Sequence, residues 1–577
     1  MIAIWWLVPI LVPLVGAMVA LLSRPARVWL PTLAPAPALV LALVGAPGSA
    51  AQFSWLLFET RLELDPIARL LLVMTALVWS AAGASARRLT ADGPAFAALF
   101  LLTMAGNIGL LLAADVVSLY TSFALMTFAA YGLVVHDRTP QAMRAGRVYV
   151  VLAVIGEVAL LSGLVFAVAA AGATGFEDVR AALPTAPHRH LIIGLLLGGF
   201  GIKAGMVPLH VWLPLAHPAA PVPASAVLSG AMIKAGLVGW LRVLPLGELA
   251  FPGWAATLVG IGITTAFVGI AVGVVQSDPK VLLAYSSISQ MGLIATVVGV
   301  GLAVPAAAGP AALAATIYAF HHGFAKAALF LGVGVRRAGI ADLRRHRVLL
   351  AGMGLAALSL AGAPLTSGWV AKQATKATVG ALPDPEAATL TLLLSLAAAG
   401  TTLLMARLLL LVGRPVLTAT PRRPLLVPWA VTVVGGVAAA TWIVPSVVVP
   451  GIQPPTPGLS GLWDGTWPVL LGVALVAGWR WVGRRRPLRV PEIPPGDLIV
   501  LLEAAVPTVT AGGRRGLAAA DATVGWLRAV RDAAYLVVRP GAGFDRAEDR
   551  LTRWRSAGVV FGLVGAALLL ALFGGGR

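Results

Sequence analysis

Residues 151–172 read VLAVIGEVALLSGLVFAVAAAG, an apolar run with a single carboxylate, Glu157. A helix needs about 20 such residues to cross the hydrocarbon core of a bilayer. Similar runs recur along most of the 577 residues, of which 59% are hydrophobic and 11% are charged. Soluble domains carry about 25% charged residues. The composition therefore excludes an ordinary water-soluble enzyme and predicts an all-α polytopic membrane protein.

The apolar runs predict about 14–16 transmembrane helices. They lie near 4–22, 29–47, 66–84, 94–113, 116–135, 146–172, 191–207, 224–244, 252–275, 281–303, 311–335, 348–380, 388–412, 426–447, 466–483 and 556–574. Segment 487–555 differs, because it opens with prolines and then mixes Leu, Ala and Val with Arg and Asp. This mixture predicts an interrupted amphipathic helix that lies along the cytoplasmic membrane face or a partner.

Arginines cluster in alternate loops, those after spans one, three, five, eleven, thirteen and fifteen. They are Arg24, Arg27, Arg87, Arg88, Arg138, Arg144, Arg147, Arg336, Arg337, Arg344, Arg345, Arg347, Arg414, Arg422, Arg423, Arg484, Arg485 and Arg486. The exceptions in the other loops are Arg61, Arg180, Arg189 and Arg242. The positive-inside rule places the Arg-rich loops in the cytoplasm of a prokaryotic cell and both termini outside. This topology explains the net charge of +19 without a nucleic-acid partner.

The chain contains no cysteine, which excludes a disulfide framework, a thiolate zinc site, an iron–sulfur cluster and a cysteine nucleophile. Acidic residues are not clustered, so we expect no metal, no cofactor and no catalytic centre in this chain. The first apolar run begins at Ile2 with no basic region before it. We therefore expect no cleavable signal peptide.

All six lysines lie in or at the edge of apolar runs: Lys203, Lys234, Lys280, Lys326, Lys372 and Lys376. Nearly every loop cation is instead arginine, which cannot lose its proton in a protein, whereas a buried lysine can. Ionisable residues inside the membrane are candidates for function, so these lysines predict a proton path. Snorkelling from a span end is the alternative, favoured for Lys376 and open for Lys280.

Other ionisable residues also lie at membrane depth. Glu157 is the one acid deep inside an expected span, and a buried carboxylate must be paired or protonated. A structural ion pair is the alternative to a role in proton transfer. His321 and His322 are adjacent, which suits a relay better than a metal site, where i, i+4 spacing is usual. Ordinary core packing remains the alternative for two further histidines, His210 and His217.

Two spans look interrupted. Prolines follow Lys203 at five positions from 208 to 223, and the stretch 364–368 (PLTSG) directly precedes Lys372. Broken helices at corresponding places in two halves indicate ion sites in transporters built from repeats. We therefore expect two inverted five-helix repeats. The expected parts of the chain are N-terminal helices 1–90, repeats 91–245 and 250–415, additional spans 416–486, the amphipathic segment 487–555 and a last helix 556–577.

Four ordered motifs resemble those of the antiporter-like subunits of respiratory complex I, membrane-bound hydrogenases and Mrp-type Na⁺/H⁺ antiporters. They are KAGMVPLHVWLP at 203–214 with AHP at 216–218 and PASAVLS at 223–229, then SDPKVLLAYSSISQMG at 277–292, HGFAKAALFL at 322–331 and PLTSGWVAK at 364–372. The resemblance covers roughly residues 90–415. The region 125–146 is most similar to the hydrogenase/Mrp branch.

The resemblance implies a role for each ionisable residue in these motifs. Lys203 would be the lysine of the broken seventh span, and Lys372 the terminal ionisable residue of the second half-channel. The central relay would consist of Lys234 and His322, joined by Lys280 and Lys326 and by the neighbouring His321. Asp278 matches an acid of the family near the tenth span.

One departure from the family is important. The fifth span normally carries Trp-Glu, and its glutamate pairs with the seventh-span lysine. The matching residues here are Phe123 and Ala124. Our hypothesis is that Glu157, on the sixth span, takes over this role and pairs with Lys203.

The leading function is translocation of protons, with Na⁺/H⁺ coupling as a variant, by one subunit of a larger membrane complex. Its partners would be other integral membrane subunits, with peripheral redox subunits if the complex is hydrogenase- or NADH dehydrogenase-like. A cation/proton antiporter is the other setting. Two alternatives stay open: a membrane partner of a zinc protein in inorganic-carbon uptake, and a degenerate structural subunit that no longer pumps, as Ala124 would allow.

Overall fold

The computed structural model describes residues 2–57, 59–89, 93–340, 342–416, 426–438, 458–485 and 493–500. In these ranges, eleven helical segments are long and apolar enough to cross a membrane. The chain is therefore a multi-pass helical membrane protein, as predicted. The further spans of the expected 14–16 stay a prediction. Most of the amphipathic segment 487–555 and all of the last helix 556–577 lie outside the described residues.

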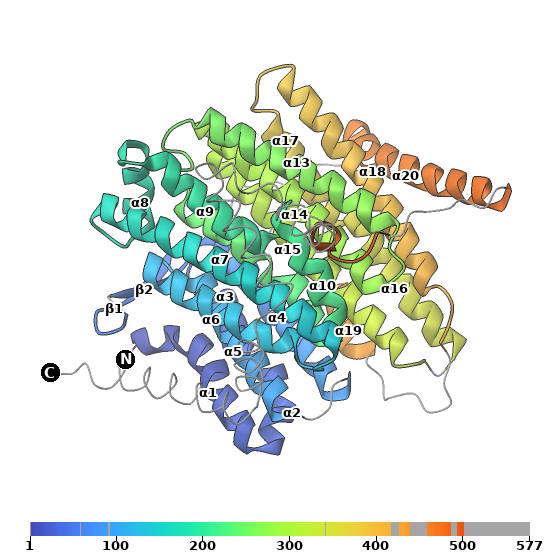
Figure 1. Ribbon diagram of the computed structural model, residues 1–577, viewed down its shortest axis with the longest axis horizontal. Coiled ribbons are helices and arrows are strands. Elements are labelled where there is room, and N and C mark those ends of the chain that lie inside the picture. The colour runs from blue at the N-terminus through green and yellow to red at the C-terminus, as the bar shows by residue number, and fades with distance from the viewer. Residues whose placement is uncertain are drawn as a thin grey trace, which may run out of the picture.

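The helices follow one another in chain order with few other elements (Figure 1). They are η1 (Ile2–Trp6), α1 (Val8–Leu22), α2 (Arg24–Leu33), α3 (Ala36–Val44), α4 (Pro66–Leu89), α5 (Pro94–Leu112), α6 (Val116–Val134), α7 (Pro140–Ala171), α8 (Phe176–Ala182), η2 (Leu183–Thr185), α9 (Arg189–Ala204), η3 (Leu209–Val211), α10 (Trp212–Ala219), α11 (Val222–Val227), η4 (Leu228–Met232), α12 (Lys234–Val243), α13 (Pro252–Val274), α14 (Pro279–Ala303), η5 (Pro305–Ala307), α15 (Ala308–Arg337), α16 (Leu343–Ala361), α17 (Ser367–Val379), α18 (Glu386–Val412), α19 (Leu426–Ala438) and α20 (Leu459–Arg485).

The described fold is not purely helical. Strands β1 (Ser49–Phe53) and β2 (Thr60–Leu64) form an antiparallel hairpin in which Ala51 pairs with Leu62. Alternate residues of β2 are buried, the period-2 pattern of a strand with one face on a core. The prediction of an all-α protein overlooked this hairpin, because ten short-strand residues between long apolar runs resemble an ordinary loop.

Burial differs sharply between the middle and the edge of the bundle. The candidate spans at 222–243 and 279–303 are fully buried, whereas only 17% of the span at 459–482 is. In Figure 1, α14 and α15 lie in the middle, and α20 lies at an edge far from α1. Polar side chains on α12, α14 and α15 are therefore shielded from the surroundings of the protein.

Loops that are predicted to lie on the same side of the membrane contact one another. The Arg61 backbone N–H donates to Asp115 (2.9 Å), and Arg242 forms an ion pair with Asp65. Of the arginines that broke the alternation, Arg242 thus pairs with a carboxylate of another loop, and the Arg61 guanidinium pairs with Glu63 of its own strand (3.4 Å). On the other predicted side, Arg337 forms an ion pair with Asp278 (2.9 Å). These contacts agree with the predicted grouping of loops, while the orientation in the membrane stays a proposal.

Both predicted helix interruptions are present. α9 ends at Gly205 (φ +72°) and α16 ends at Gly362 (φ +84°), left-handed conformations that glycine adopts without a steric penalty. The chain then resumes as the short helices η3 and α10 after the first break, and as α17 after the second. Each break leaves backbone carbonyl groups without helical partners, and each lies beside a lysine.

Candidate functional site

Lys203 lies in the last turn of α9, and hydroxyl groups hold its ammonium. Nζ donates hydrogen bonds to Thr127 Oγ1 (3.0 Å) and to the Tyr149 hydroxyl (3.5 Å). The Phe123 ring centre lies 5.5 Å from Nζ, within the range of a cation–π attraction. Only 5% of Lys203 is exposed. The structure therefore places this lysine in the protein interior and not at a snorkelling position.

Glu157, on α7, lines the same small cavity as Lys203. Its two carboxylate oxygens are buried and make no hydrogen bond of standard length and angle among the described residues, although Thr127 lies close to them. The charges of Glu157 and Lys203 are close enough to interact, but these two described residues form no direct ion pair. The hypothesis that they pair is thus supported by a shared cavity and not by a contact.

Two central lysines bond to one network of serine and backbone oxygens. Lys234 Nζ donates to the Ser229 carbonyl (2.6 Å), and the Ser229 and Ser287 hydroxyls are 2.7 Å apart. Ser287 donates to the Leu283 carbonyl (2.9 Å), which also accepts from Lys326 Nζ (3.0 Å). Both lysines are almost completely buried. Helices η4, α12, α14 and α15 thus bring together residues that the sequence assigned to the relay.

The two adjacent histidines of α15 point to different neighbours. His322 is fully buried, and neither ring nitrogen has a hydrogen-bond partner among the described residues. Lys234 and Lys326 are close enough to His322 for their charges to interact with it. His321 Nδ1 lies 2.7 Å from the hydroxyl of Ser367, the first residue of α17. His321 therefore connects the centre of the bundle to the second helix break.

Lys280 and Asp278 occupy different surroundings although they are two residues apart. Lys280 is 2% exposed, and its Nζ donates to the Ala220 carbonyl at the end of α10 (2.5 Å). Its charge is close enough to interact with buried His217. Asp278 instead caps the N-terminus of α14 and pairs with Arg337, and both these side chains are about two-fifths exposed. Helix capping is thus an alternative to a relay role for Asp278.

Lys372 forms hydrogen bonds to the backbone at the second helix break. Its Nζ donates to the carbonyls of Leu360 (2.9 Å) and Ala361 (2.7 Å), which belong to the last turn of α16. A cation at the C-terminal end of a helix is electrostatically favourable. Gly362 leaves room for it, since a Cβ there would lie 2.6 Å from the Lys372 side chain. The break therefore supplies both the carbonyl acceptors and the space that the Lys372 side chain occupies.

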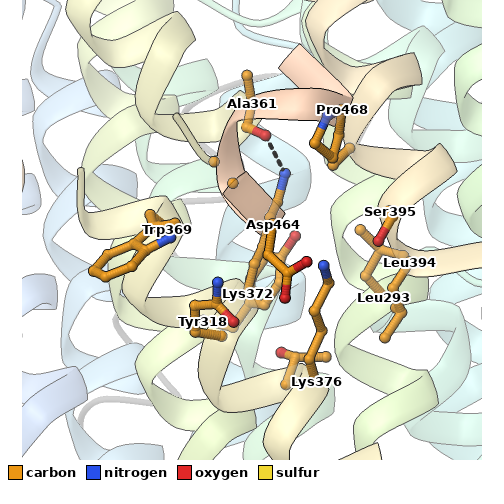
Figure 2. A pocket seen from close by; sticks show the side chains of 15 residues that line it. Leu293, Tyr318, Ala361, Trp369, Lys372, Lys376, Leu394, Ser395, Asp464 and Pro468 are labelled. Carbon is orange, nitrogen blue, oxygen red and sulfur yellow. Dashed lines mark hydrogen bonds between the residues drawn. The ribbon is translucent and has the colours of Figure 1, made fainter. Parts of the chain in front are cut away.

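A cavity opens beside Lys372 between α17, α18 and α20 (Figure 2). Its lining includes Tyr318, Trp369, Lys372, Gln373, Lys376, Ser395 and Asp464. In Figure 2 the Asp464 carboxylate and the Lys376 ammonium point toward one another. Sequence reasoning missed Asp464, because it predicted the span to begin at 466, whereas α20 begins at Leu459. An acid within a longer apolar helix was the available signal.

A second missed carboxylate covers the first break. Asp497 Oδ2 lies 3.1 Å from His210 Nε2 and accepts from the Tyr285 hydroxyl (3.3 Å). Burial alone would raise the pKa of Asp497, but the hydrogen bond and charge of His210, with the Leu498 N–H and Tyr285, bring its pKa below the ordinary value. His210 is thus hydrogen-bonded to a carboxylate inside the fold. This contact fits the alternative in which His210 has a structural role.

The uncharged members of these networks were also missed. Thr127 and Tyr149 hold Lys203, and Ser229 and Ser287 join Lys234 to Lys326. Hydroxyl residues are common in apolar helices, so their residue type alone carries little signal. Membership of Ser229 and Ser287 in the motifs at 223–229 and 277–292 was the evidence that could have indicated them.

Residues 113–395 match the family described as NADH:quinone oxidoreductase/Mrp antiporter, transmembrane. The resemblance inferred from the four motifs is thereby confirmed. The matched range contains both helix breaks and every candidate residue named from the sequence. Asp464 and Asp497 lie beyond it.

Curated relatives and a solved structure agree with this match. An uncharacterized protein of Mycobacterium tuberculosis is 37% identical over 297 residues, which are 48% of this chain and 45% of that protein. Hydrogenase-4 component B of Escherichia coli is 34% identical over 220 residues, 37% of this chain and 33% of that protein. The chain thus covers less than half the length of these relatives. A chain of the Mrp complex from Dietzia has a similar fold, with a TM-score of 0.73, 26% identity, and coverage of 91% of this chain and 61% of that chain.

Proposed function

We propose that this chain is a proton-translocating, antiporter-like subunit of a multisubunit membrane complex. Protons would move through Lys203 and Glu157, the central residues Lys234, Lys280, Lys326, His321 and His322, and the terminal Lys372. Coupling of Na⁺ to the protons is a variant of the same proposal. The similarity to hydrogenase-4 component B and to a chain of the Mrp complex supports membership in a multisubunit membrane complex. The buried lysines, histidines and glutamate support proton transfer.

The observation that carries the proposal is that the buried Lys234 and Lys326 bond to one network formed by Ser229, Ser287 and Leu283. Two lysines buried in one apolar core raise each other's cost of being charged. A proton that arrives at one of them therefore favours departure of the proton from the other. The carbonyls of Ser229 and Leu283 that hold the two ammonium groups only accept hydrogen bonds. A proton would therefore pass between the lysines through water, or through the Ser229 and Ser287 hydroxyls after a lysine side chain turns toward them.

We propose that residues 91–245 and 250–415 form two repeats, because the order of elements is similar in the two ranges. In the first, α7 is followed by the broken pair α9 and α10 and then by α11 to α12. In the second, α15 is followed by the broken pair α16 and α17 and then by α18. We propose that these repeats are inverted relative to each other, flanked by helices 1–90 and by the C-terminal parts from 416 onward. The Arg-rich loops would face the cytoplasm.

Proton flux in the reconstituted complex tests the proposal. The complex is isolated in mild detergent with its native partners and placed in proteoliposomes under a potassium diffusion potential, with a pH-sensitive dye inside. Lys326→Met should lower the proton flux on the order of 10²-fold, the usual contribution of a positioned proton-transfer group. Thr316→Val is the matched control, because Thr316 is buried on the same helix but bonds only to its own helix (Ala312 carbonyl, 2.7 Å).

The outcomes separate the candidate functions. Normal flux in Lys326→Met would contradict a lysine relay. A wild-type complex that conducts no protons, and whose lysine variants change only assembly, would indicate the structural subunit that Ala124 allows. The proteins that co-purify decide the setting: redox subunits indicate a redox-driven pump, small membrane subunits alone indicate a secondary antiporter, and a lone zinc protein indicates carbon uptake.

A further inference from the structure

Asp464 is an acid on a membrane helix that lies outside the matched range 113–395. It is exposed at the surface of the described fold but also lines the cavity that contains Lys372 and Lys376. An acid within an apolar membrane helix is costly and is usually retained for function or paired. Asp464 is therefore a candidate functional residue.

The start of α20 is held firmly against α17. The indole N–H of Trp369 and the amide of Gln373 both donate to the Gly461 carbonyl, at 3.0 and 3.1 Å. Gly465 packs so closely on Trp369 that a Cβ there would lie 2.5 Å from the indole. Two donors on one carbonyl and this close approach fix the turn that carries Asp464. These contacts between α17 and α20 thus hold the Asp464 carboxylate at the cavity.

The three charged groups differ in exposure: Lys372 and Lys376 are partly buried and Asp464 is exposed. Lys372 reaches inward to the carbonyls freed by the break. Lys376 lies one turn further along α17, on the same face as Lys372 because i and i+4 side chains are neighbours on a helix. Asp464 lies nearest the start of α20, at the opposite end from Arg484 and Arg485. In the topology proposed above, this end faces outward.

We propose that Asp464 and Lys376 form the outlet of the proton path, in which α20 supplies the carboxylate that receives the proton from Lys372. This inference rests on the proposed function. One N–H bond of the Lys372 ammonium breaks as an O–H bond of the carboxyl group forms, directly or through water in the cavity. The carboxyl group then releases the proton to the outer face. The Lys376 ammonium favours the ionised carboxylate by Coulomb attraction and thereby favours release.

Because the natural chain has no cysteine, accessibility can be measured without a transport assay. Lys376→Cys is expressed with the native complex, and membrane-impermeant thiosulfonate reagents of either charge are added to one face at a time. Labelling is scored on this chain after isolation. We expect reaction from the outer face and a preference for the cationic reagent of about fivefold, as one unit charge a few ångströms away would cause. Adding Asp464→Asn should abolish that preference.

Transport supplies the second readout. Asp464→Asn should lower proton flux by about tenfold, and Asp464→Glu should recover most of it. The control is Thr466→Val on the same helix, since the Thr466 hydroxyl bonds only within α20 (Leu462 carbonyl, 2.7 Å).

Failure of the inference and failure of the proposed function give different results. If Lys326→Met blocks flux but Asp464→Asn does not, the outlet is wrong and the relay stands. If Lys376→Cys reacts only from the cytoplasmic face, or its charge preference is unchanged by Asp464→Asn, the outlet is also wrong. If Lys326→Met conducts normally, the relay is wrong and the outlet for protons falls with it.

Discussion

The two lysine sites beside the helix breaks differ in how each ammonium is held. At the first break, Lys203 bonds to the hydroxyls of Thr127 and Tyr149, with the buried Glu157 in the same cavity. At the second, Lys372 bonds to backbone carbonyls that the break itself has freed. The first site therefore depends on side chains of three helices, and the second depends on the backbone geometry of one interruption.

Each break is also covered by a C-terminal element beyond the family match, and each element brings an aspartate. Residues 493–500 place Asp497 against His210 in the first break, and α20 places Asp464 at the cavity of the second. Asp497 is in direct contact with its partner, whereas Asp464 lies at an exposed rim. This difference suggests that the first cover is a fixed contact and the second is a place where protons can leave.

The largest expected effect concerns the backbone of the second break. A Cβ at Gly368 would lie 1.7 Å from the Ser359 carbonyl oxygen, whereas a Cβ at Gly201, near the first break, would meet nothing closer than 3.7 Å. Gly368→Ala should therefore destabilise the protein by more than about 4 kcal/mol and sharply reduce the yield of assembled complex. Gly201→Ala is the matched control. Size-exclusion chromatography of detergent extracts measures both, and equal yields would contradict the tight packing inferred here.

A smaller effect distinguishes the electrostatics of the two sites. Lys203→Met leaves Glu157 as an uncompensated buried charge, so thermal stability should fall, and adding Glu157→Gln should recover about 1 kcal/mol. Lys372→Met with Asp464→Asn should show no such recovery, because Lys376 still balances the charge of Asp464 in Lys372→Met. Thermal unfolding of the four single and two double variants measures the coupling.

The same variants test the role assigned to Glu157 in transport. If Glu157 substitutes for the missing glutamate at position 124, Glu157→Gln should lower proton flux along with Lys203→Met. Unchanged flux in Glu157→Gln would refute that assignment and leave only a structural coupling.

The smallest effect concerns the cover of the first break. Asp497→Asn removes a charge-assisted hydrogen bond to His210 and should loosen residues 493–500 by about 1 kcal/mol. Because the pKa of Asp497 lies below its ordinary value in the folded protein, its contribution is complete at neutral pH and is lost as the pH falls through the lowered value. Limited proteolysis as a function of pH should show this loss in the natural chain and not in Asp497→Asn. Identical profiles would contradict it.

Much of the fold and of the candidate site follows from local sequence. Apolar runs of about 20 residues can only be satisfied as membrane helices, and the structure contains helices at the expected positions throughout the described residues. Glycine and proline placed both interruptions, because they act on the backbone where they stand. The lysines could be identified as candidates since any ionisable group inside such a helix is costly.

Contacts between distant segments could not be read in this way. Nothing local to Ser229 and Ser287 shows that their hydroxyls meet across 58 positions of the chain, or that Glu157 shares a cavity with Lys203 and yet makes no direct ion pair with it. Asp464 and Asp497 reach the two breaks from segments beyond the family match. Hydropathy and turn chemistry depend on neighbours along the chain, whereas these pairings depend on how whole helices pack, and packing is set by all the helices together.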